Sequence, residues 1–223
     1  MTLINRISAR LLTGILLALW AVAASAQAEY EVNVYTGWQT APHSTVSGVD
    51  ENGTPFEFTA GWDGRSFEAP PYYGFRVTRW QQNGWGIGLE FTHAKIYADD
   101  ETLADSGFSM LEFTDGHNVV TVNASKRFAL SDRWSTHAGL GLGIAVPYVE
   151  VTTPGGITTE EYQLTGPAVR WFAGVSYDIT DRWSVYGEYG GTYSPNEADL
   201  TGGGSLETDV ITNAVNIGIG FSF

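Results

Sequence analysis

The chain has 223 residues, with 25 acidic residues, 11 basic residues and no cysteine, and its formal net charge is −14. This charge argues against a nucleic-acid partner, and the lack of cysteine excludes disulfides, thiol catalysis and cysteine-ligated metals. The 27 glycines and the aromatic content of 13% favour a β protein over a helical one.

Residues 1–28 are expected to form an export signal. Arg6 and Arg10 supply positive charge before an apolar run over residues 11–23, and the small residues at 24–28 provide a cleavage site. The apolar run is shorter than the roughly 20 residues that a membrane-spanning helix needs. Removal of this segment takes away two arginines and no acid, which leaves a formal charge of −16 on the expected folded domain, residues 29–223.

Apolar and polar residues alternate in eight segments, which is the pattern of β-strands with two different faces. In the first segment Val32, Val34 and Trp38 fall on one face, with Asn33 and Tyr35 on the other. The expected strands cover residues 29–39, 72–81, 85–97, 117–128, 133–150, 166–178, 182–193 and 212–223.

The second and third strands are joined by a three-residue turn, Gln-Asn-Gly at 82–84, which is typical of a tight hairpin. If Gln81 pairs with Trp85, then Arg76 lies directly opposite Glu90 on the inward face. The spacing therefore predicts a buried ion pair between Arg76 and Glu90.

The connections between strands fall into two classes. Residues 82–84, 129–132 and 179–181 are short turns, whereas residues 40–71, 98–116, 151–165 and 194–207 are long connections. The phrases SDRWS at 131–135 and TDRWS at 180–184 indicate a recurring turn with an interfacial tryptophan. Short turns at one end and long loops at the other are typical of outer-membrane barrels, in which the short turns face the periplasm.

The last segment, TNAVNIGIGFSF at 212–223, completes the pattern. Val215, Ile217 and Ile219 fall on one face, small and polar residues fall on the other, and the chain ends on Phe223. A strand that is apolar outward and polar inward suits a wall between lipid and a polar interior. The sequence therefore predicts an all-β protein: an eight-stranded antiparallel transmembrane β-barrel, integral to the outer membrane of a Gram-negative cell as a monomer, with four long extracellular loops and periplasmic termini.

The inward faces carry polar and charged residues, which an eight-stranded barrel has just enough room to hold. A packed polar plug is the simpler interpretation, and passage of protons or ions is the alternative. The glycine run GLGLG at 139–143 imitates a dinucleotide-binding motif, but no helix follows it, so barrel packing explains it better. The predicted lumen residues are Glu31, Asn33, Arg76, Glu90, Asn123, His137, Arg170, Glu188 and Asn216.

Eighteen of the 25 acidic residues lie in the four long connections and their flanks, where Arg65 is the only base apart from Lys95. An acidic rim beside anionic lipopolysaccharide would need bridging divalent cations, because like charges repel each other. The alternative is a solvated loop surface without bound ions.

The first long connection is dense in aromatic rings and prolines, unlike a disordered loop. It contributes to a set of long motifs: YTGWQTAPHS at 35–44, GWDGRSFEAPPYYG at 61–74, LEFTDGHN at 111–118, EYQLTGPA at 161–168 and GTYSPNEADLTGGG at 191–204. In these motifs the chain resembles the lipid A oxidase family of rhizobial and related α-proteobacterial outer membranes. The similarity extends from the first expected strand to the last.

The resemblance implies an oxidoreductase that acts on lipid A of the outer leaflet with dioxygen as the oxidant. The implied reaction converts the hemiacetal carbon of the proximal glucosamine to a 2-aminogluconate unit and releases peroxide, after that sugar has lost its 1-phosphate. The motifs gather on the long-loop side, where the head group of an outer-leaflet lipid would lie.

Oxidation by dioxygen needs a one-electron carrier or a flavin, and a filled barrel of this size has no room for a flavin fold. A divalent first-row metal held by histidine and carboxylates is the economical alternative, although the sequence does not identify the ion. We expect catalytic residues among His43, Asp63, Arg65 and Glu68, and metal ligands among His93, Glu112, Asp115 and His117.

These histidines also have structural interpretations. His93 continues the outward row of Phe91, opposite Tyr73, where an imidazole would lie at head-group height as an interfacial residue. His43 and His117 follow turn-forming residues, so each can cap a loop as well as bind a ligand. No spacing of the HExxH type is present.

Two other functions remain open. A lipid A deacylase would carry a His-x-Ser pair on one strand face, and no histidine of this chain is followed two residues later by serine, although another lipid A-modifying activity remains open. A non-enzymatic OmpA-like or adhesin-like barrel would contact a partner through its loops, and the fold alone does not decide between these functions.

Overall fold

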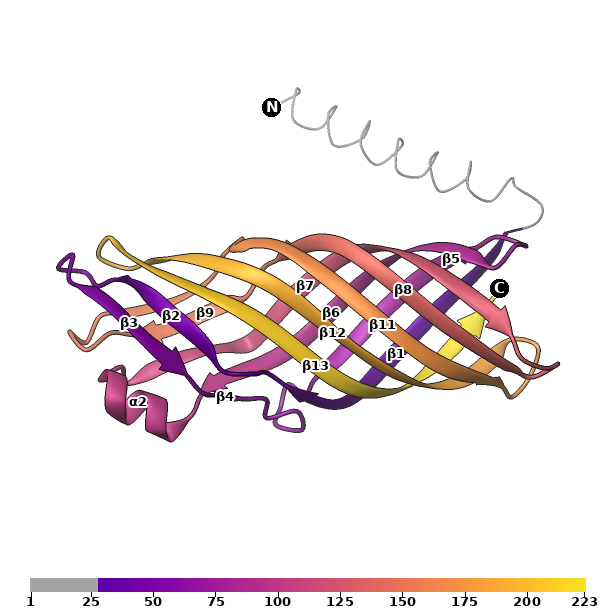
Figure 1. Cartoon of the computed structure of the whole chain (residues 1–223), viewed down its shortest axis with the longest axis horizontal. Helices are drawn as coiled ribbons and strands as arrows, with labels where there is room; N and C mark the ends of the chain where they lie inside the picture. The colour runs from indigo at the N-terminus through magenta and orange to yellow at the C-terminus, as the bar shows by residue number, and fades with distance from the viewer. Residues whose placement is uncertain (1–27) are drawn as a thin grey trace, which may run out of the picture.

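The computed structural model describes residues 28–223, apart from the side chain of Thr114. The expected export signal therefore lies outside the described residues, except for Ala28. Figure 1 shows an elongated barrel with the C-terminus and the short turns at one end and a group of smaller elements at the other. No helix in the described part of the chain is long and apolar enough to cross a membrane.

Eight antiparallel strands close the barrel, which confirms the predicted fold class. Each strand pairs with the next along the chain, and β13 pairs with β1 from Glu31↔Ser222 to Thr40↔Asn213. Within residues 28–223 the barrel strands are β1 (Glu29–Thr40), β5 (Tyr73–Trp80), β6 (Trp85–Ala98), β7 (Met110–Ala129), β8 (Trp134–Ala145), β11 (Gly166–Asp178), β12 (Trp183–Leu200) and β13 (Gly204–Ser222).

Side chains alternate between the two faces of the barrel wall. Leu140 on β8 and Ile217 on β13 are 67% and 68% exposed, whereas the inward Asn216 is 3% exposed. Such an outward apolar surface is what a wall facing lipid requires. Trp134 and Trp183, which follow the short turns, are half-exposed at one edge of this surface, as expected for interfacial tryptophans.

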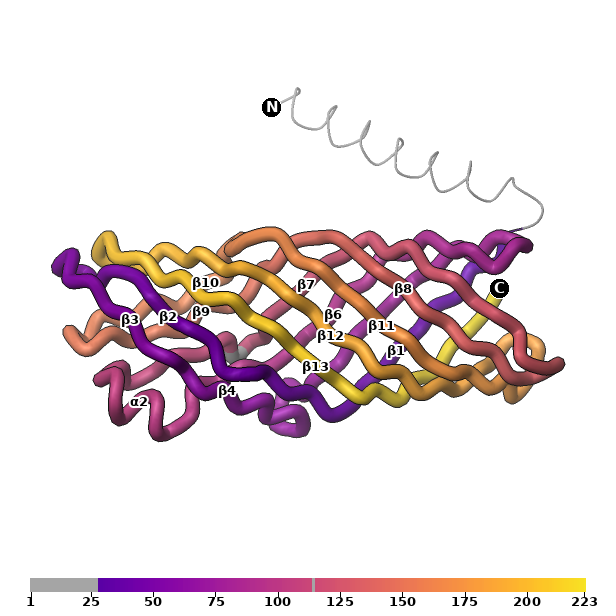
Figure 2. Tube along the Cα trace, viewed as in Figure 1, coloured from indigo at the N-terminus to yellow at the C-terminus, as the bar shows by residue number. Residues whose placement is uncertain are grey.

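The long connections form a folded lobe with its own apolar core. Val46, Ile96, Phe113 and Val151 are fully buried in it. Figure 2 shows its hairpins and helix at the end opposite the C-terminus. We call this part the loop lobe; it comprises β2 (Ser44–Val49), β3 (Pro55–Ala60), β4 (Trp62–Asp63), α2 (Asp100–Ser106), β9 (Tyr148–Thr152), β10 (Thr158–Tyr162) and the adjoining ends of the barrel strands.

The prediction of a fourth long loop over residues 194–207 is wrong. β12 and β13 continue as one hairpin up to the pair Leu200↔Gly204. The turn uses Gly202 and Gly203, whose φ angles of 91° and 97° favour glycine. Its hydrophilic composition was misleading because polar residues such as Asn196 point inward and are buried.

Two predicted strand boundaries also differ from the structure. The strand expected over residues 133–150 ends at Ala145, because Pro147 has no N–H group with which to continue the ladder. The strand expected to begin at residue 117 begins at Met110. Its pairing with β6 is irregular between Ala94 and Ile96, so the extension lacks the simple alternation on which the prediction relied.

Four charged side chains form a closed network in the lumen. Arg76 lies opposite Glu90 in the register of β5 and β6, which confirms the predicted pair, and Arg76 Nε lies 3.2 Å from Glu90 Oε2. Arg76 also contacts Glu188 at 2.7 Å. Arg170 lies 3.1 Å from both glutamates. Because all four residues are buried, the network plugs the middle of the barrel.

We expect Arg76→Ala to destabilise the barrel by about 3–5 kcal/mol, because two buried glutamates are left with one cation between them. Urea unfolding of the purified protein, followed by its heat-modifiable shift in gel mobility, measures the loss. Arg182→Ala is the matched control, since Arg182 is exposed at the short-turn end. An unfolding midpoint that Arg76→Ala leaves unchanged would contradict the role of the network.

Candidate functional site

A groove of ≈470 Å³ lies on the wall of the loop lobe. Its floor is the outward face of β12 and β13, where Tyr193 pairs with Ile211 and Glu197 pairs with Glu207. One side is formed by β2 and the segment before it, which carries His43. The lining residues are Pro42, His43, Ser44, Thr45, Ser47, Tyr193, Pro195, Asn196, Glu197, Glu207, Thr208, Asp209 and Ile211.

A chain of hydrogen bonds ties the groove to the core of the loop lobe. Trp62 Nε1 donates to Ser44 Oγ at 2.8 Å, and Ser44 Oγ lies 3.0 Å from Thr208 Oγ1. Thr208 Oγ1 in turn donates to the carbonyl oxygen of Thr45 at 3.0 Å. Because Trp62 is part of the buried core, these bonds fix the side of the groove to the first-loop motif.

Three carboxylates make the groove acidic. Glu197 and Glu207 lie directly opposite each other on adjacent strands, and Asp209 lies on the same outward face. His43 is the exposed titratable base beside them. This charge distribution favours a neutral or cationic ligand with hydroxyl groups and disfavours a phosphate.

His43 also lies near the start of α2. Two hydrogen bonds from Thr102 hold the pKa of Asp99, the N-cap of this helix, below its usual value, and the nearby His43 lowers that pKa further when its ring is protonated. The imidazole of His43 therefore lies between the acidic lining of the groove and the N-cap of α2.

The other candidate catalytic residues, Asp63, Arg65 and Glu68, form a second cluster around β4. Asp63 pairs with Tyr97, and the Arg65 guanidinium lies 4.2 Å from the centre of the Tyr97 ring. Arg65 Nη1 is 3.9 Å from Glu68 Oε2, and both side chains are largely exposed, so this ion pair contributes little stability. Only His43 of the four predicted catalytic residues lines the groove.

A sequence family described as the outer membrane protein beta-barrel domain matches residues 14–223. The chain belongs to this family. It is accordingly an integral protein of the outer membrane. No curated protein matches the chain.

Solved structures with a similar fold include Neisserial surface protein A, at 12% identity over 87% of this chain and 97% of that chain with a TM-score of 0.49. Others are the outer membrane protease OmpT from Escherichia coli (9% identity, 90% and 98% coverage, TM-score 0.47) and the N-terminal barrel domain of OprF from Pseudomonas aeruginosa (12%, 88% and 98%, 0.42). At such identities the likeness concerns the fold alone.

The structure does not bring the four predicted metal ligands, His93, Glu112, Asp115 and His117, together. His117 is fully buried, with Nε2 3.0 Å from Ser194 Oγ. His117 pairs with Ala94 on β6, whereas His93 pairs with Asn118, so the two histidines point to opposite faces of the sheet. Among residues 28–223, no three His, Cys, Asp or Glu side chains are placed to hold a metal ion. The residues therefore do not fit the predicted centre.

His93 lies in the predicted row, opposite Tyr73, but it is only 4% exposed rather than open to lipid head groups. Its ring stacks on that of Tyr73 at 5.0 Å, and Nδ1 lies 2.9 Å from Asn118 Oδ1. Gly116 presses its backbone against the imidazole, where any Cβ would collide with the ring, and its φ of 100° favours glycine. The alternation of residues along a strand cannot reveal that Tyr73 and Gly116 cover the imidazole of His93.

Glu197, Glu207 and Asp209 fall in the expected fourth long connection and its flank, and no motif of the sequence groups them with His43. The available signal was the alternation of residues 193–200 and 204–211, which continues the period of the two flanking strands. If the two expected strands are extended through residues 193–200 and 204–211, their odd-numbered residues, including Glu197, Glu207 and Asp209, fall on one outward face.

A row of three glutamates crosses the loop lobe, because Glu150 pairs with Glu112 on β7 and with Glu160 on β10. Burial raises the pKa of Glu150 above its usual 4.5, and Glu160 raises it further. Burial and the charge of Glu150 likewise raise the pKa of Glu112. A carboxyl group whose pKa is higher in the folded state contributes stability below its unfolded pKa, and this contribution is lost as the pH rises through the folded pKa.

We therefore expect Glu150→Gln to raise the thermal unfolding midpoint at pH 7.5 and to change it much less at pH 4, below the usual pKa of 4.5, where most of the glutamate is protonated in both states. Near-UV circular dichroism of the refolded protein measures both midpoints. Glu161→Gln is the control, because it makes the same charge change on the neighbouring strand β10, where Glu161 pairs with Val149 rather than with a glutamate. Equal shifts in the two variants would contradict the coupling of the three glutamates.

Proposed function

We propose that the protein is a lipid A oxidase, with the loop lobe outside the cell and the termini in the periplasm. In this reaction the hemiacetal C–H and O–H groups of the proximal glucosamine of 1-dephosphorylated lipid A give up two protons and two electrons in total to dioxygen. The sugar becomes a lactone, which water opens to a 2-aminogluconate unit, and dioxygen becomes hydrogen peroxide.

The observation that carries the proposal is that three distant motifs meet at the groove. Residues 35–44 supply His43, residues 191–204 supply Glu197, and residues 61–74 supply Trp62 behind the side wall. These motifs are among those in which the chain resembles lipid A oxidases. Because these three motifs contribute residues to one groove, the groove is the place where the activity implied by the resemblance would be carried out.

The position of the groove also supports a lipid substrate. Toward the short-turn end, the outward face of β13 continues from Ile211 to Val215, Ile217 and Ile219, which are exposed on the apolar wall. A lipid whose acyl chains lay along this strip would bring its sugar head group to the groove. The loop lobe would then surround the sugar without covering the acyl chains.

The lining residues suggest their own roles. His43 can accept the hydroxyl proton of the hemiacetal as a general base. The carboxylates of Glu197, Glu207 and Asp209 can accept hydrogen bonds from sugar hydroxyl groups and repel a phosphate. This repulsion agrees with a substrate that has lost its 1-phosphate.

Dioxygen requires a partner for one-electron steps. Because the predicted metal ligands are not assembled among the described residues, we assign no step to a bound metal. Elemental analysis of the purified, active protein would identify any ion that supplies this chemistry.

A non-enzymatic surface barrel is the second candidate function. It is favoured by the large apolar side chains at the surface of the loop lobe, where Phe67 is 76% exposed and Tyr162 is 57% exposed. Such a barrel would contact a protein partner through these side chains if the partner covered both of them. A barrel of this type would leave lipid A unchanged.

Mass spectrometry of 1-dephosphorylated lipid A separates the two functions. The lipid is incubated with the refolded protein in air and under nitrogen, with divalent metals supplied. An oxidase adds one oxygen to the proximal sugar in air only and releases peroxide. Unchanged lipid in both atmospheres, with folded protein, would refute the oxidase.

We expect His43→Ala to lower the rate of oxidation by about 10²-fold, because the groove loses its base. The heat-modifiable gel shift should stay unchanged, since His43 is exposed. Glu57→Gln, an exposed change on the neighbouring β3, is the control and should keep full activity. Activity that is retained in His43→Ala but lost in Glu68→Ala would move the chemistry to the cluster around β4.

A further inference from the structure

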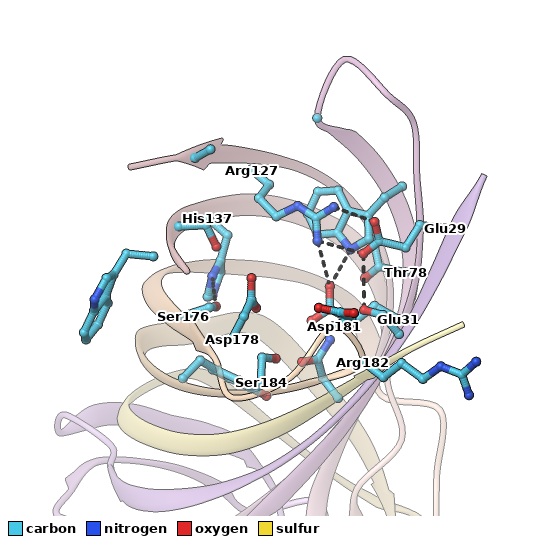
Figure 3. Close-up of a pocket in the computed structure, with 18 of the residues that line it drawn as sticks. Glu29, Glu31, Thr78, Arg127, His137, Ser176, Asp178, Asp181, Arg182 and Ser184 are labelled. Atoms are coloured by element: carbon cyan, nitrogen blue, oxygen red, sulfur yellow. Dashed lines mark hydrogen bonds and ion pairs between the residues drawn. The ribbon is translucent and has the colours of Figure 1, made fainter. Parts of the chain in front are cut away.

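A cavity of ≈570 Å³ opens at the short-turn end of the barrel, and we call it the vestibule. The short turns line its mouth, where Figure 3 labels Asp181 and Arg182, and its lining also includes Arg76 of the plug, Phe172 and Tyr186. It shares no lining residue with the groove of the loop lobe. In the orientation proposed above it faces the periplasm, so any chemistry here is separate from lipid A oxidation.

Three neighbouring strands place a histidine beside a glutamate in the vestibule wall. In the register, Gly174 on β11 lies between His137 on β8 and Glu188 on β12. A Cβ at residue 174 would lie 2.8 Å from His137 Nε2. Because glycine leaves this space free, the imidazole crosses β11 and reaches the carboxylate of Glu188.

The two ring nitrogens of His137 have different partners. Nε2 lies 3.1 Å from Glu188 Oε2, and Nδ1 lies 3.2 Å from Ser176 Oγ. A glutamate paired with two arginines only accepts hydrogen bonds, so we assign the proton of the neutral ring to Nε2. Nδ1 is then the acceptor, and the Ser176 hydroxyl donates to it. Figure 3 shows Ser176 and His137 pointing toward each other.

Two further contacts complete the arrangement. Arg76 at 2.7 Å and Arg170 at 3.1 Å fix the position of the Glu188 carboxylate. The hydroxyl group of Tyr186 is buried in the vestibule wall without a hydrogen-bond partner in the described part of the chain, and its ring lies 5.8 Å from that of His137. The phenol end of Tyr186 packs over Gly218 on β13, whereas Ser176 lies on β11 at the other side of β12, so Tyr186 packs beside the imidazole without facing the serine.

We propose that the vestibule is a serine hydrolase site for small carboxylic esters, in which Ser176 is the nucleophile, His137 is the base and Glu188 positions the base. Hydroxyl, imidazole and carboxylate in this order form the constellation that activates serine in hydrolases of unrelated folds. The cavity volume falls within the range of about 300–1,000 Å³ that is usual for small-molecule sites.

The reaction has two steps. Ser176 Oγ attacks the ester carbonyl carbon while its proton passes to His137 Nδ1, and the alcohol then leaves with the proton from Nδ1. Water then attacks the acyl-serine and gives a proton to Nδ1. The carboxylic acid departs, and the proton returns to Ser176 Oγ. No oxidant or cofactor is consumed.

The test uses the purified chain, refolded in detergent, with a fluorophosphonate probe and with p-nitrophenyl acetate. We expect one probe adduct by intact mass, mapped to Ser176, and ester hydrolysis above the micelle blank. Ser176→Ala should abolish the adduct, and both Ser176→Ala and His137→Gln should lower the hydrolysis rate by at least about 10²-fold.

Ser135→Ala is the matched control, because Ser135 is the register partner of Ser176 and lines the same cavity. It should keep both the adduct and the full hydrolysis rate. The heat-modifiable gel shift verifies that each variant is folded. Folded wild-type protein without an adduct, an adduct that persists in Ser176→Ala, or an equal loss of rate in Ser135→Ala would each overturn the proposal.

Discussion

The charged network in the lumen is the constraint on which the rest of the structure depends. A buried ion costs several kcal/mol unless paired charges and hydrogen bonds replace its water. Here each glutamate contacts both arginines, and Glu90 also accepts hydrogen bonds from Tyr35 and Asn123 at 2.6 Å each. Six of the eight barrel strands, β1, β5, β6, β7, β11 and β12, each supply one of these side chains, so their mutual contacts fix the relative positions of much of the wall.

The same network divides the molecule into two independent ends. The vestibule ends at the plug, whereas the loop lobe beyond it is closed by an apolar core that includes Val46, Phe113 and Leu206. A solute in the vestibule therefore meets packed side chains rather than an open channel. The groove lies on the outward face of β12 and β13, where a membrane lipid can approach it from the side.

Strand positions and local pairings could be predicted because they depend on a period of two and on turn length. Arg76 and Glu90 are separated by one tight turn, and their contact follows from counting. Contacts across the barrel do not follow in this way. The bond between Arg76 and Glu188 joins residues 112 positions apart, and it depends on barrel closure and on the lengths of two long side chains.

The candidate site shows the same division. His43 was selected from its motif, but its acidic neighbours Glu207 and Asp209 come from the opposite end of the chain through the pairing of β2 with β13. The predicted metal ligands are not brought together, because His93 and His117 lie on paired strands yet point to opposite faces of the sheet. Sequence proximity identified residues near the site, and strand parity decided which of them can act together.

Glu188 links the stability of the barrel to the chemistry of the vestibule. One of its oxygen atoms contacts Arg170, and the other contacts both Arg76 and His137. A change that loosens the plug would therefore also move the group that orients the imidazole. The groove lacks this dependence, because its hydrogen bonds connect to Trp62 and the lobe core instead. The two ends can consequently vary in sequence independently, except at the residues that the plug and the vestibule share.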